Sequence, residues 1–484
     1  MRKCRLFFFI ICSLVKSSIA QIDLQKSVDW FIEDPVNKNA SISIQVIDLD
    51  TDSVLATANE FTSLMCASTA KLFSTSTALN VLGREHRAET RFYTNGLVDS
   101  LGVLQGDLII RGGGDVSLGS RFFNEEGLEF SFMHDWLDSL KSYGISSING
   151  NIVADGSEFG YEGVPDGWDW SDMGNYYGVG ASGINYYDNT LKFHFNTGKS
   201  GDLVEFIGNT PEVEGLFFQH NIKAANIRRD NSYIYGSPFS LIRFGRGSLP
   251  SNKEDFVVKG SLPDPEFQLA HDFKRFLNDT SFAVYGHANG NRLLGGDGIA
   301  YDSLHHLYSY PGRRVIDIVN KTNLYSVNLF AEGLLHMVGY QKYKYGSTNS
   351  GISAIYRFWS GKIDLGGLSI KDGSGLSRKN AVSASHFCQL LKQIYFSSIY
   401  ADFRGSLSIA GDSGTLKNVC RGQKGANRIF AKSGTLSNVK AYSGYVQTES
   451  GKNLAFAVIA NNFNCSKSQI VKKMELMFNA MAAY

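Results

Sequence analysis

Residues 66–82 read CASTAKLFSTSTALNVL, and their apolar positions recur with helical spacing, which predicts a helix from Ser68 to about Leu82. Ser68 and Lys71 are three positions apart at its start, so they should lie on one face within reach of each other. A serine hydroxyl is a weak nucleophile, and a desolvated lysine can serve as its base because burial lowers the pKa of the amine. Taken alone, this motif is weak, and Ser68 is better explained as the N-cap of the helix.

Two short motifs far along the chain carry side chains that could complete such a site. Ser326-Val327-Asn328 lies on or just before a helix predicted over 320–338, and a hydroxyl and a carboxamide two residues apart can shuttle a proton and orient an amide substrate. Lys432-Ser433-Gly434-Thr435 follows a predicted strand, and its lysine and two hydroxyls suit a carboxylate. Gly434 lets a ligand approach the backbone closely, and the N–H groups of Thr435 and Ser68 could form an oxyanion hole. Singly, these motifs are also explained as a helix start and a turn.

The two ends of the chain together predict one antiparallel sheet of about five strands with helices packed on it. The segments with strand character are 41–47, 54–56, 427–431, 440–448 and 454–460. A terminal helix should follow, with its apolar face formed by Ile470, Val471, Met474, Met477, Phe478 and Met481. Between the ends, short β-like runs alternate with turns. We therefore expect an α+β fold in which one domain, 21–90 plus 300–484, is interrupted by a mostly β insertion, 91–299, of one or two subdomains.

The composition excludes several classes of protein. The chain has 484 residues, of which 43% are hydrophobic and 19% charged, and this is too apolar for a disordered chain. Its formal net charge of +1 provides no electrostatic footprint for nucleic acid, so no nucleic-acid partner is expected. The length allows roughly two to four domains.

The N-terminus predicts export. Basic residues precede an apolar run over 6–15, and small residues end it, which is the pattern of a secretory signal peptide cleaved after Ala20. Because this run is too short to span a bilayer, we expect residues 1–20 to be removed and no integral membrane span to remain. Cys420 and Cys465 could pair in an oxidising compartment, although buried free thiols are commoner, and no cysteine spacing predicts a metal site.

The three motifs in this order, Ser-X-X-Lys, Ser-X-Asn and Lys-Ser/Thr-Gly, are the pattern of penicillin-recognising serine acyltransferases. The interval between the first two is far too long for an ordinary β-lactamase and fits an inserted region. The chain resembles the type-4 penicillin-binding proteins, the class C low-molecular-mass D-alanyl-D-alanine carboxypeptidases and endopeptidases. Other stretches that carry the resemblance are 106–108 with 112–115, 168–172 with 176–178, 320–321, 372–378, 409–416, and 434–436 with 442–446. The chain departs from the family at Ser433, where threonine is usual, but the hydroxyl is retained.

The resemblance implies a serine-type mechanism for hydrolysing the D-Ala–D-Ala bond of peptidoglycan stem peptides. Ser68 would attack the penultimate D-Ala carbonyl with Lys71 as its base. Ser326 would pass a proton to the leaving amine, and Asn328 would orient Lys71 and the substrate. Water would then hydrolyse the acyl-enzyme, and penicillins would acylate the same serine. No metal or organic cofactor is implied.

The resemblance also implies how the substrate is held. Lys432, Ser433 and Thr435 would bind the terminal carboxylate. Arg378 and Asp155 would face the far end of the stem peptide, where a diamino acid presents a carboxylate and an ammonium group. The partners are thus peptidoglycan stem peptides and β-lactam antibiotics, in the bacterial periplasm or cell-wall space.

Two other functions fit the same motifs. One is a β-lactamase or esterase on a related scaffold, which steady-state turnover of nitrocefin would distinguish. The other is a non-catalytic β-lactam-binding sensor or wall protein, which the intact motif residues disfavour. The balance of carboxypeptidase and endopeptidase action, the third stem residue and the oligomeric state are not decided by the sequence.

Overall fold

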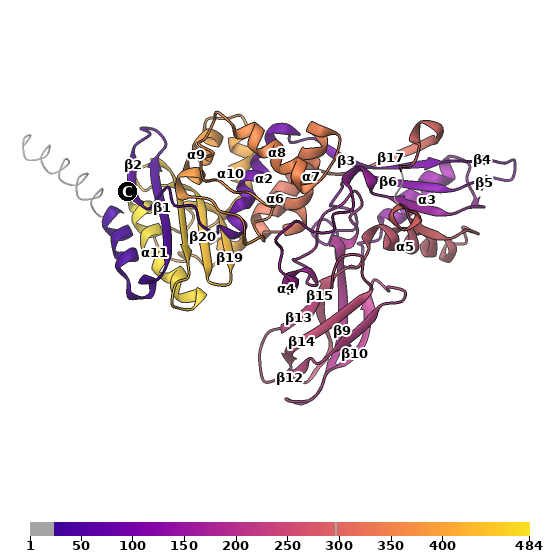
Figure 1. The fold of residues 1–484 in the computed structure, drawn as a ribbon, viewed down its shortest axis with the longest axis horizontal. Coiled ribbons are helices and arrows are strands. Elements are labelled where there is room, and N and C mark those ends of the chain that lie inside the picture. The colour runs from indigo at the N-terminus through magenta and orange to yellow at the C-terminus, as the bar shows by residue number, and fades with distance from the viewer. Residues whose placement is uncertain (1–23, 296–297) are drawn as a thin grey trace, which may run out of the picture. The chain divides into compact units, whose positions relative to one another are not determined.

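The computed structural model describes residues 24–295 and 298–484, which form two compact units (Figure 1). Within the described residues, unit 1 runs to Asn80 and continues with Val319–Val327 and Ile355–Tyr484. Unit 2 consists of Val81–Ile318 and Asn328–Ala354. The predicted signal peptide, 1–20, lies outside the described residues.

Unit 1 is built on a six-stranded antiparallel sheet with the order β18-β19-β20-β21-β1-β2. Its strands are β18 Ser408–Ile409, β19 Ile429–Leu436, β20 Val439–Gln447, β21 Asn453–Asn461, β1 Ser41–Asp48 and β2 Val54–Ala58. The two ends of the chain meet where β1 pairs with β21, from Ser41 opposite Asn461 to Asp48 opposite Leu454. About five strands were expected, and the two-residue β18 is the additional one at the edge.

Helices cover both faces of this sheet. Across both units, the α-helices in the described residues are 24–33, α2 Lys71–Val81, α3 Phe132–Ser142, α4 Trp170–Met173, α5 Pro265–Asp279, α6 Val315–Tyr325, α7 Asn328–Tyr343, α8 Thr348–Trp359, α9 Ala384–Tyr395, α10 Tyr400–Ser406 and α11 Lys467–Ala483. Two of these, α11 and α9, pack on opposite faces of the unit 1 sheet. Met474 and Phe478 of α11 share a core with Ile44 of β1. On the opposite side, the α9 residue Cys388 lies against the carbonyl of Gln45.

The strand predicted at 41–47 is more deeply buried than its alternating pattern indicates. Such alternation is typical of a strand with one face in solvent, but every residue of β1 after Ser41 is buried. The polar residues face α9 instead of water, and the Ala384 N–H donates to Ser43 Oγ at 3.0 Å. The face of β1 that was expected to meet solvent is therefore covered by α9, a helix far away in the sequence.

The third motif lies within a strand rather than after one. The strand predicted to end at residue 431 continues as β19 to Leu436, paired throughout with β20. The Lys432–Thr435 motif is therefore held in extended backbone by cross-strand hydrogen bonds. The C-terminal helix has the expected buried face, except that Val471 is only partly buried.

Unit 2 is mostly β. Its largest sheet has the order β16-β8-β6-β3-β17, with β3 Arg87–Thr94, β6 Leu108–Gly112, β8 Ile152–Asp155, β16 Ala288–Gly290 and β17 His305–Arg314. The smaller sheets contain β4 Leu97–Val98, β5 Val103–Gln105 and β7 Ser147–Ile148; β9 Thr190–Thr197, β10 Glu205–Thr210 and β15 Lys253–Ser261; and β11 Phe217–His220, β12 Lys223–Ala225, β13 Asn231–Tyr235 and β14 Ile242–Pro250.

The units divide the chain at positions other than 90 and 300, where the domain boundaries were predicted. Strands β3 and β17 pair with each other, from Arg87 opposite Arg314 to Thr94 opposite His305, so both belong to unit 2. The segment 328–354, which includes α7, also belongs to unit 2. Strand composition does not say which strand pairs with which, so the sequence could not locate these boundaries.

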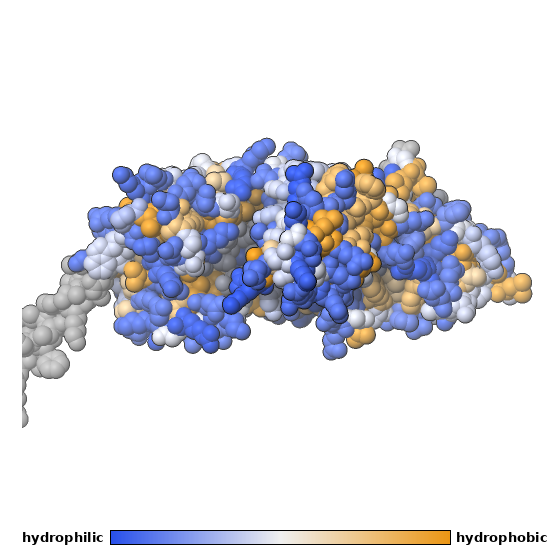
Figure 2. All heavy atoms as spheres, turned by 90° about the horizontal axis from the view of Figure 1, so that it is seen from below, coloured by the Kyte–Doolittle hydropathy of each residue, from blue (hydrophilic) through white to orange (hydrophobic). Residues whose placement is uncertain are grey.

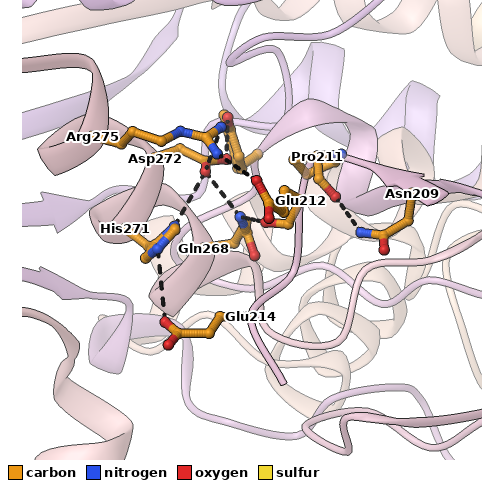
Figure 3. Close-up of polar contacts among 9 residues, drawn as sticks. Asn209, Pro211, Glu212, Glu214, Gln268, His271, Asp272 and Arg275 are labelled. Atoms are coloured by element: carbon orange, nitrogen blue, oxygen red, sulfur yellow. Dashed lines mark hydrogen bonds and ion pairs between the residues drawn. The ribbon is translucent and has the colours of Figure 1, made fainter. Parts of the chain in front are cut away.

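A polar network in unit 2 ties the segment after β10 to α5 (Figure 3). Gln268 Nε2 donates to the Glu212 carbonyl at 2.9 Å and to Asp272 Oδ1 at 3.0 Å. The Arg275 guanidinium bridges the carboxylates of Glu212 and Asp272, at 3.2 and 3.5 Å. The polar groups of this network pair with one another, and they hold the irregular segment after β10 against α5.

The face of the molecule shown in Figure 2 is mostly hydrophilic, with separate hydrophobic patches. Of the helices in the described residues, none is both long and apolar enough to cross a membrane.

Candidate active site

The first motif places a serine beside a buried amine. One turn of 3-10 helix, Ala67–Ala70, leads directly into α2, which begins at Lys71. Lys71 Nζ lies 3.0 Å from Ser68 Oγ, in agreement with the helical spacing. Lys71 is fully buried, whereas Ser68 is partly exposed. A reachable hydroxyl within proton-transfer distance of a desolvated amine is the geometry that an activated serine requires.

A loop from residues 372–380 holds Lys71 from its other side. Lys71 Nζ donates to the Ser374 carbonyl at 2.7 Å. The buried Asp372 carboxylate shapes this loop by accepting from the N–H groups of Gly375 and Ser377, at 2.7 and 2.6 Å. This stretch carries part of the family resemblance, but no role was predicted for Ser374 or Asp372. An aspartate followed by Gly-Ser-Gly is turn chemistry that could have indicated the loop.

The second and third motifs meet at a hydrogen bond between their polar side chains. Lys432 Nζ donates to Ser326 Oγ at 2.9 Å and to the Ser433 carbonyl at 2.8 Å. Burial, together with the charges of Lys71 and Lys440, lowers the pKa of Lys432 well below its ordinary value. Ser326 lies between α6 and α7 with φ +61°, a left-handed conformation that non-glycine residues seldom adopt. Such strain often accompanies functional positions.

Asn328, the remaining residue of the second motif, is the first residue of α7 and belongs to unit 2. Its Nδ2 donates to the Tyr177 carbonyl at 2.8 Å. Tyr177 lies in one of the stretches on which the resemblance rests. The orienting role expected for Asn328 stays a prediction.

Strand β19 passes close beside Ser68. A methyl group at Gly434 would lie 2.5 Å from the Cys66 carbonyl oxygen and 3.2 Å from the Ser68 nitrogen, so only glycine fits here. Ser433 is buried, and its hydroxyl donates to Thr415 Oγ1 at 2.9 Å. Thr435 is exposed and accepts a hydrogen bond from Lys440. Thr415 and Lys440 were not singled out from the sequence.

Gly434→Ala is expected to reduce acylation of Ser68 by penicillin at least about tenfold, because the added methyl group would push β19 away from the Ser68 N–H. The measurement is the second-order acylation rate. Gly405→Ala is the matched control, since a methyl group at that α10 position meets nothing within 4 Å. Equal rates for wild type and Gly434→Ala would show that this close approach has no role in acylation.

The two residues expected at the far end of the substrate lie in different units. Arg378 is exposed at the end of the 372–378 stretch in unit 1. Asp155 is fully buried in unit 2, where its carboxylate accepts from Asn291 Nδ2 at 2.9 Å and from the Tyr301 hydroxyl. This burial favours a structural role for Asp155, and the substrate contact expected for it stays a prediction.

The four cysteines in the described residues form no disulfide. Cys66, Cys388, Cys420 and Cys465 are all free thiols, so Cys420 and Cys465 are not paired. Burial raises the pKa of the Cys66 thiol to about 12, which keeps it protonated although it lies two residues before Ser68. Across 24–295 and 298–484, no cluster of three or more histidine, cysteine, aspartate or glutamate side chains could hold a metal ion.

Comparison with known proteins identifies the family. The model of the D-Ala-D-Ala carboxypeptidase 3 (S13) family matches residues 24–483. The chain belongs to this S13 family. The D-alanyl-D-alanine carboxypeptidase of Actinomadura sp. (strain R39) is 28% identical, over 91% of this chain and 81% of that protein. D-alanyl-D-alanine carboxypeptidase DacB of Haemophilus influenzae is 24% identical, over 86% of this chain and 84% of its own length.

A solved structure supports the S13 fold. The crystal structure of penicillin-binding protein 4 from Haemophilus influenzae matches with a TM-score of 0.79 at 21% identity, covering 96% of this chain and 99% of that chain. The predicted α+β, penicillin-recognising fold is confirmed. As a member of the S13 family, the protein is a serine-type D-alanyl-D-alanine carboxypeptidase, as predicted.

Proposed function

We propose that Ser68 and Lys71 carry the carboxypeptidase reaction on peptidoglycan stem peptides, through an acyl-enzyme on Ser68. The observation that supports this most directly is the 3.0 Å separation of Lys71 Nζ and Ser68 Oγ, with the amine buried and the hydroxyl reachable. In the neutral form, Lys71 accepts the Ser68 proton while Oγ bonds to the penultimate D-Ala carbonyl carbon. The negative charge that develops on the carbonyl oxygen is stabilised by the N–H groups of Ser68 and Thr435.

Ser326 passes its hydroxyl proton to the leaving amine and takes back the proton that Lys71 accepted from Ser68. Because Lys432 Nζ donates to Ser326 Oγ at 2.9 Å, the Ser326 hydroxyl hydrogen is directed to another acceptor, the leaving nitrogen. The C–N bond breaks, terminal D-Ala departs as the amine, and a water molecule then hydrolyses the ester at Ser68. Lys432 and the exposed Thr435 hydroxyl bind the carboxylate of the departing D-Ala.

We infer that β-lactams acylate the same serine, because their strained amide and carboxylate present the same two groups. Penicillin-binding protein 4 of Haemophilus influenzae has been solved in complex with a β-lactam. We further propose that the protein acts in the bacterial periplasm or cell-wall space after removal of residues 1–20, and that it also cleaves cross-links between stem peptides.

The decisive experiment is incubation of the purified protein with muropeptides, followed by mass spectrometry of the products. Loss of one D-Ala from pentapeptides would support carboxypeptidase action, and conversion of cross-linked dimers to monomers would support endopeptidase action. Rapid steady-state turnover of nitrocefin, without a lasting adduct, would instead indicate a β-lactamase.

Arg378→Ala is expected to slow hydrolysis of a stem peptide with a free diaminopimelate end by about tenfold, the effect of one charge-assisted hydrogen bond. Penicillin acylation should change little, because penicillin lacks that end of the peptide and the lost binding is remote from the bond that breaks. Lys379→Ala, which removes the neighbouring exposed charge, is the control. Equal losses on peptide and penicillin would indicate a structural arginine.

A further inference from the structure

A second buried amine lies behind the exposed hydroxyl of the third motif. The β19–β20 register places Thr435 directly opposite Lys440, and Lys440 Nζ donates to Thr435 Oγ1 at 2.8 Å. Lys440 is buried, whereas Thr435 is exposed. Because an ammonium group can only donate, the Thr435 oxygen must accept this bond. The hydroxyl hydrogen of Thr435 is then left to donate to another group on the exposed side.

The charges around Lys440 are of one sign. Lys432 on β19 and Lys467 at the start of α11 act electrostatically with it, and the Tyr442 ring centroid of β20 lies 4.5 Å from its Nζ. In the described part of the chain, neither Lys432 nor Lys440 forms an ion pair with a carboxylate. Burial and the charge of Lys467 lower the pKa of Lys440 to about 8. The register places Lys440 on the same face of the sheet as Thr435, and a desolvated amine without a counter-ion is a group that a bound anion would stabilise.

We propose that Lys440 is a positioning residue for the terminal carboxylate of the substrate: it fixes the Thr435 hydroxyl as a donor toward the carboxylate and adds positive charge behind it. This assignment rests on the proposed function, since it places the carboxylate at Thr435. It extends the carboxylate site beyond the Lys432–Thr435 motif to the partner strand, and it makes the site selective for substrates and inhibitors with an anionic terminus.

The alternative is that Lys440 only fills space over Tyr442. Lys440→Met separates the two roles, because methionine keeps an unbranched stem over the ring and lacks the charge and the donor. Lys440→Arg keeps a charge that does not titrate near neutral pH. Lys472→Met is the matched control, since it removes one positive charge from an exposed position of α11 in the same unit.

The readout is acylation of each purified variant, followed by intact-protein mass spectrometry, with benzylpenicillin and with benzylpenicillin methyl ester. The two compounds share the reacting amide and differ in the carboxylate. Lys440→Met is expected to slow acylation by benzylpenicillin about tenfold or more, the effect of losing a charge-assisted interaction, and to leave the ester within about twofold of wild type. Lys472→Met should change neither rate.

The pH dependence supplies a second readout. In wild type, the ratio of benzylpenicillin to ester acylation should fall as pH rises through about 8, where Lys440 loses its proton and its charge. A change that acts only on the reacting amide alters both rates equally and cancels in this ratio. Lys440→Arg should retain the preference for the carboxylate above this pH.

The outcomes separate this inference from the proposed function. Equal losses on both compounds, or an unchanged ratio in Lys440→Met, would overturn the positioning role while leaving the acyl-enzyme mechanism in place. A fall in the ratio that persists in Lys440→Arg would assign the titration to another group and also contradict the inference. If wild type forms no adduct with benzylpenicillin, the proposed function fails and the role of Lys440 fails with it.

Discussion

Ser68→Ala is expected to abolish covalent labelling by a fluorescent penicillin and to remove D-Ala release from muropeptides. The substitution takes away the oxygen that forms the acyl-enzyme, and no other group can replace it in that bond. Labelling is measured on a denaturing gel after incubation of equal amounts of wild type and variant. Because Ser68 is only partly buried, the variant should unfold at nearly the wild-type temperature.

Ser437→Ala is the matched control, since this exposed serine lies just after β19 and has no part in the proposed mechanism. It should label like wild type. Undiminished labelling of Ser68→Ala would move the nucleophile to another residue and contradict the central proposal.

Lys71→Met is expected to slow acylation by about 100-fold or more, the usual range for loss of a general base. Methionine keeps most of the buried stem beside Ser68 but cannot accept the hydroxyl proton. The rate of adduct formation is measured by stopping the reaction at intervals. Thermal unfolding of the variant and of wild type is compared, so that a slower rate caused by loss of the base is distinguished from one caused by unfolding.

Lys371→Met provides the control for Lys71, because it removes an exposed charge just before the loop that holds the Lys71 amine. Its acylation rate should stay within about twofold of wild type. If Lys71→Met loses less than about tenfold while remaining folded, Lys71 is not the base.

The pairing of Ser68 with Lys71 was predictable because it depends on a local rule. Residues three apart at the start of a helix share a face whatever the rest of the fold does. The strand that leads into the third motif was predictable for a similar reason, since β-strand composition is a local signal, but its continuation through Lys432–Thr435 was not. The order of the three motifs then indicated the family, which the match over residues 24–483 shows.

The contacts of Lys432 and Lys440 were not predictable in this way. The bond from Lys432 to Ser326 joins residues more than 100 positions apart and depends on the left-handed backbone of Ser326. The bond from Lys440 to Thr435 depends on the register of the β19–β20 hairpin, and a shift of one residue would turn Lys440 to the other face. Asp155 shows the same limit, because its burial among Asn291 and Tyr301 results from long-range packing.

The sequence by itself determined the placement of Ser68 beside the amine of Lys71, the succession of the three motifs and the α+β class, since each depends on spacing along the chain. Only the tertiary structure decided which strands pair, where the two units divide, and that Lys71, Lys432 and Lys440 are buried. The physical reason is that desolvation and long-range hydrogen bonds arise when segments far apart in the chain pack together, and these two effects tune the amines on which the chemistry depends.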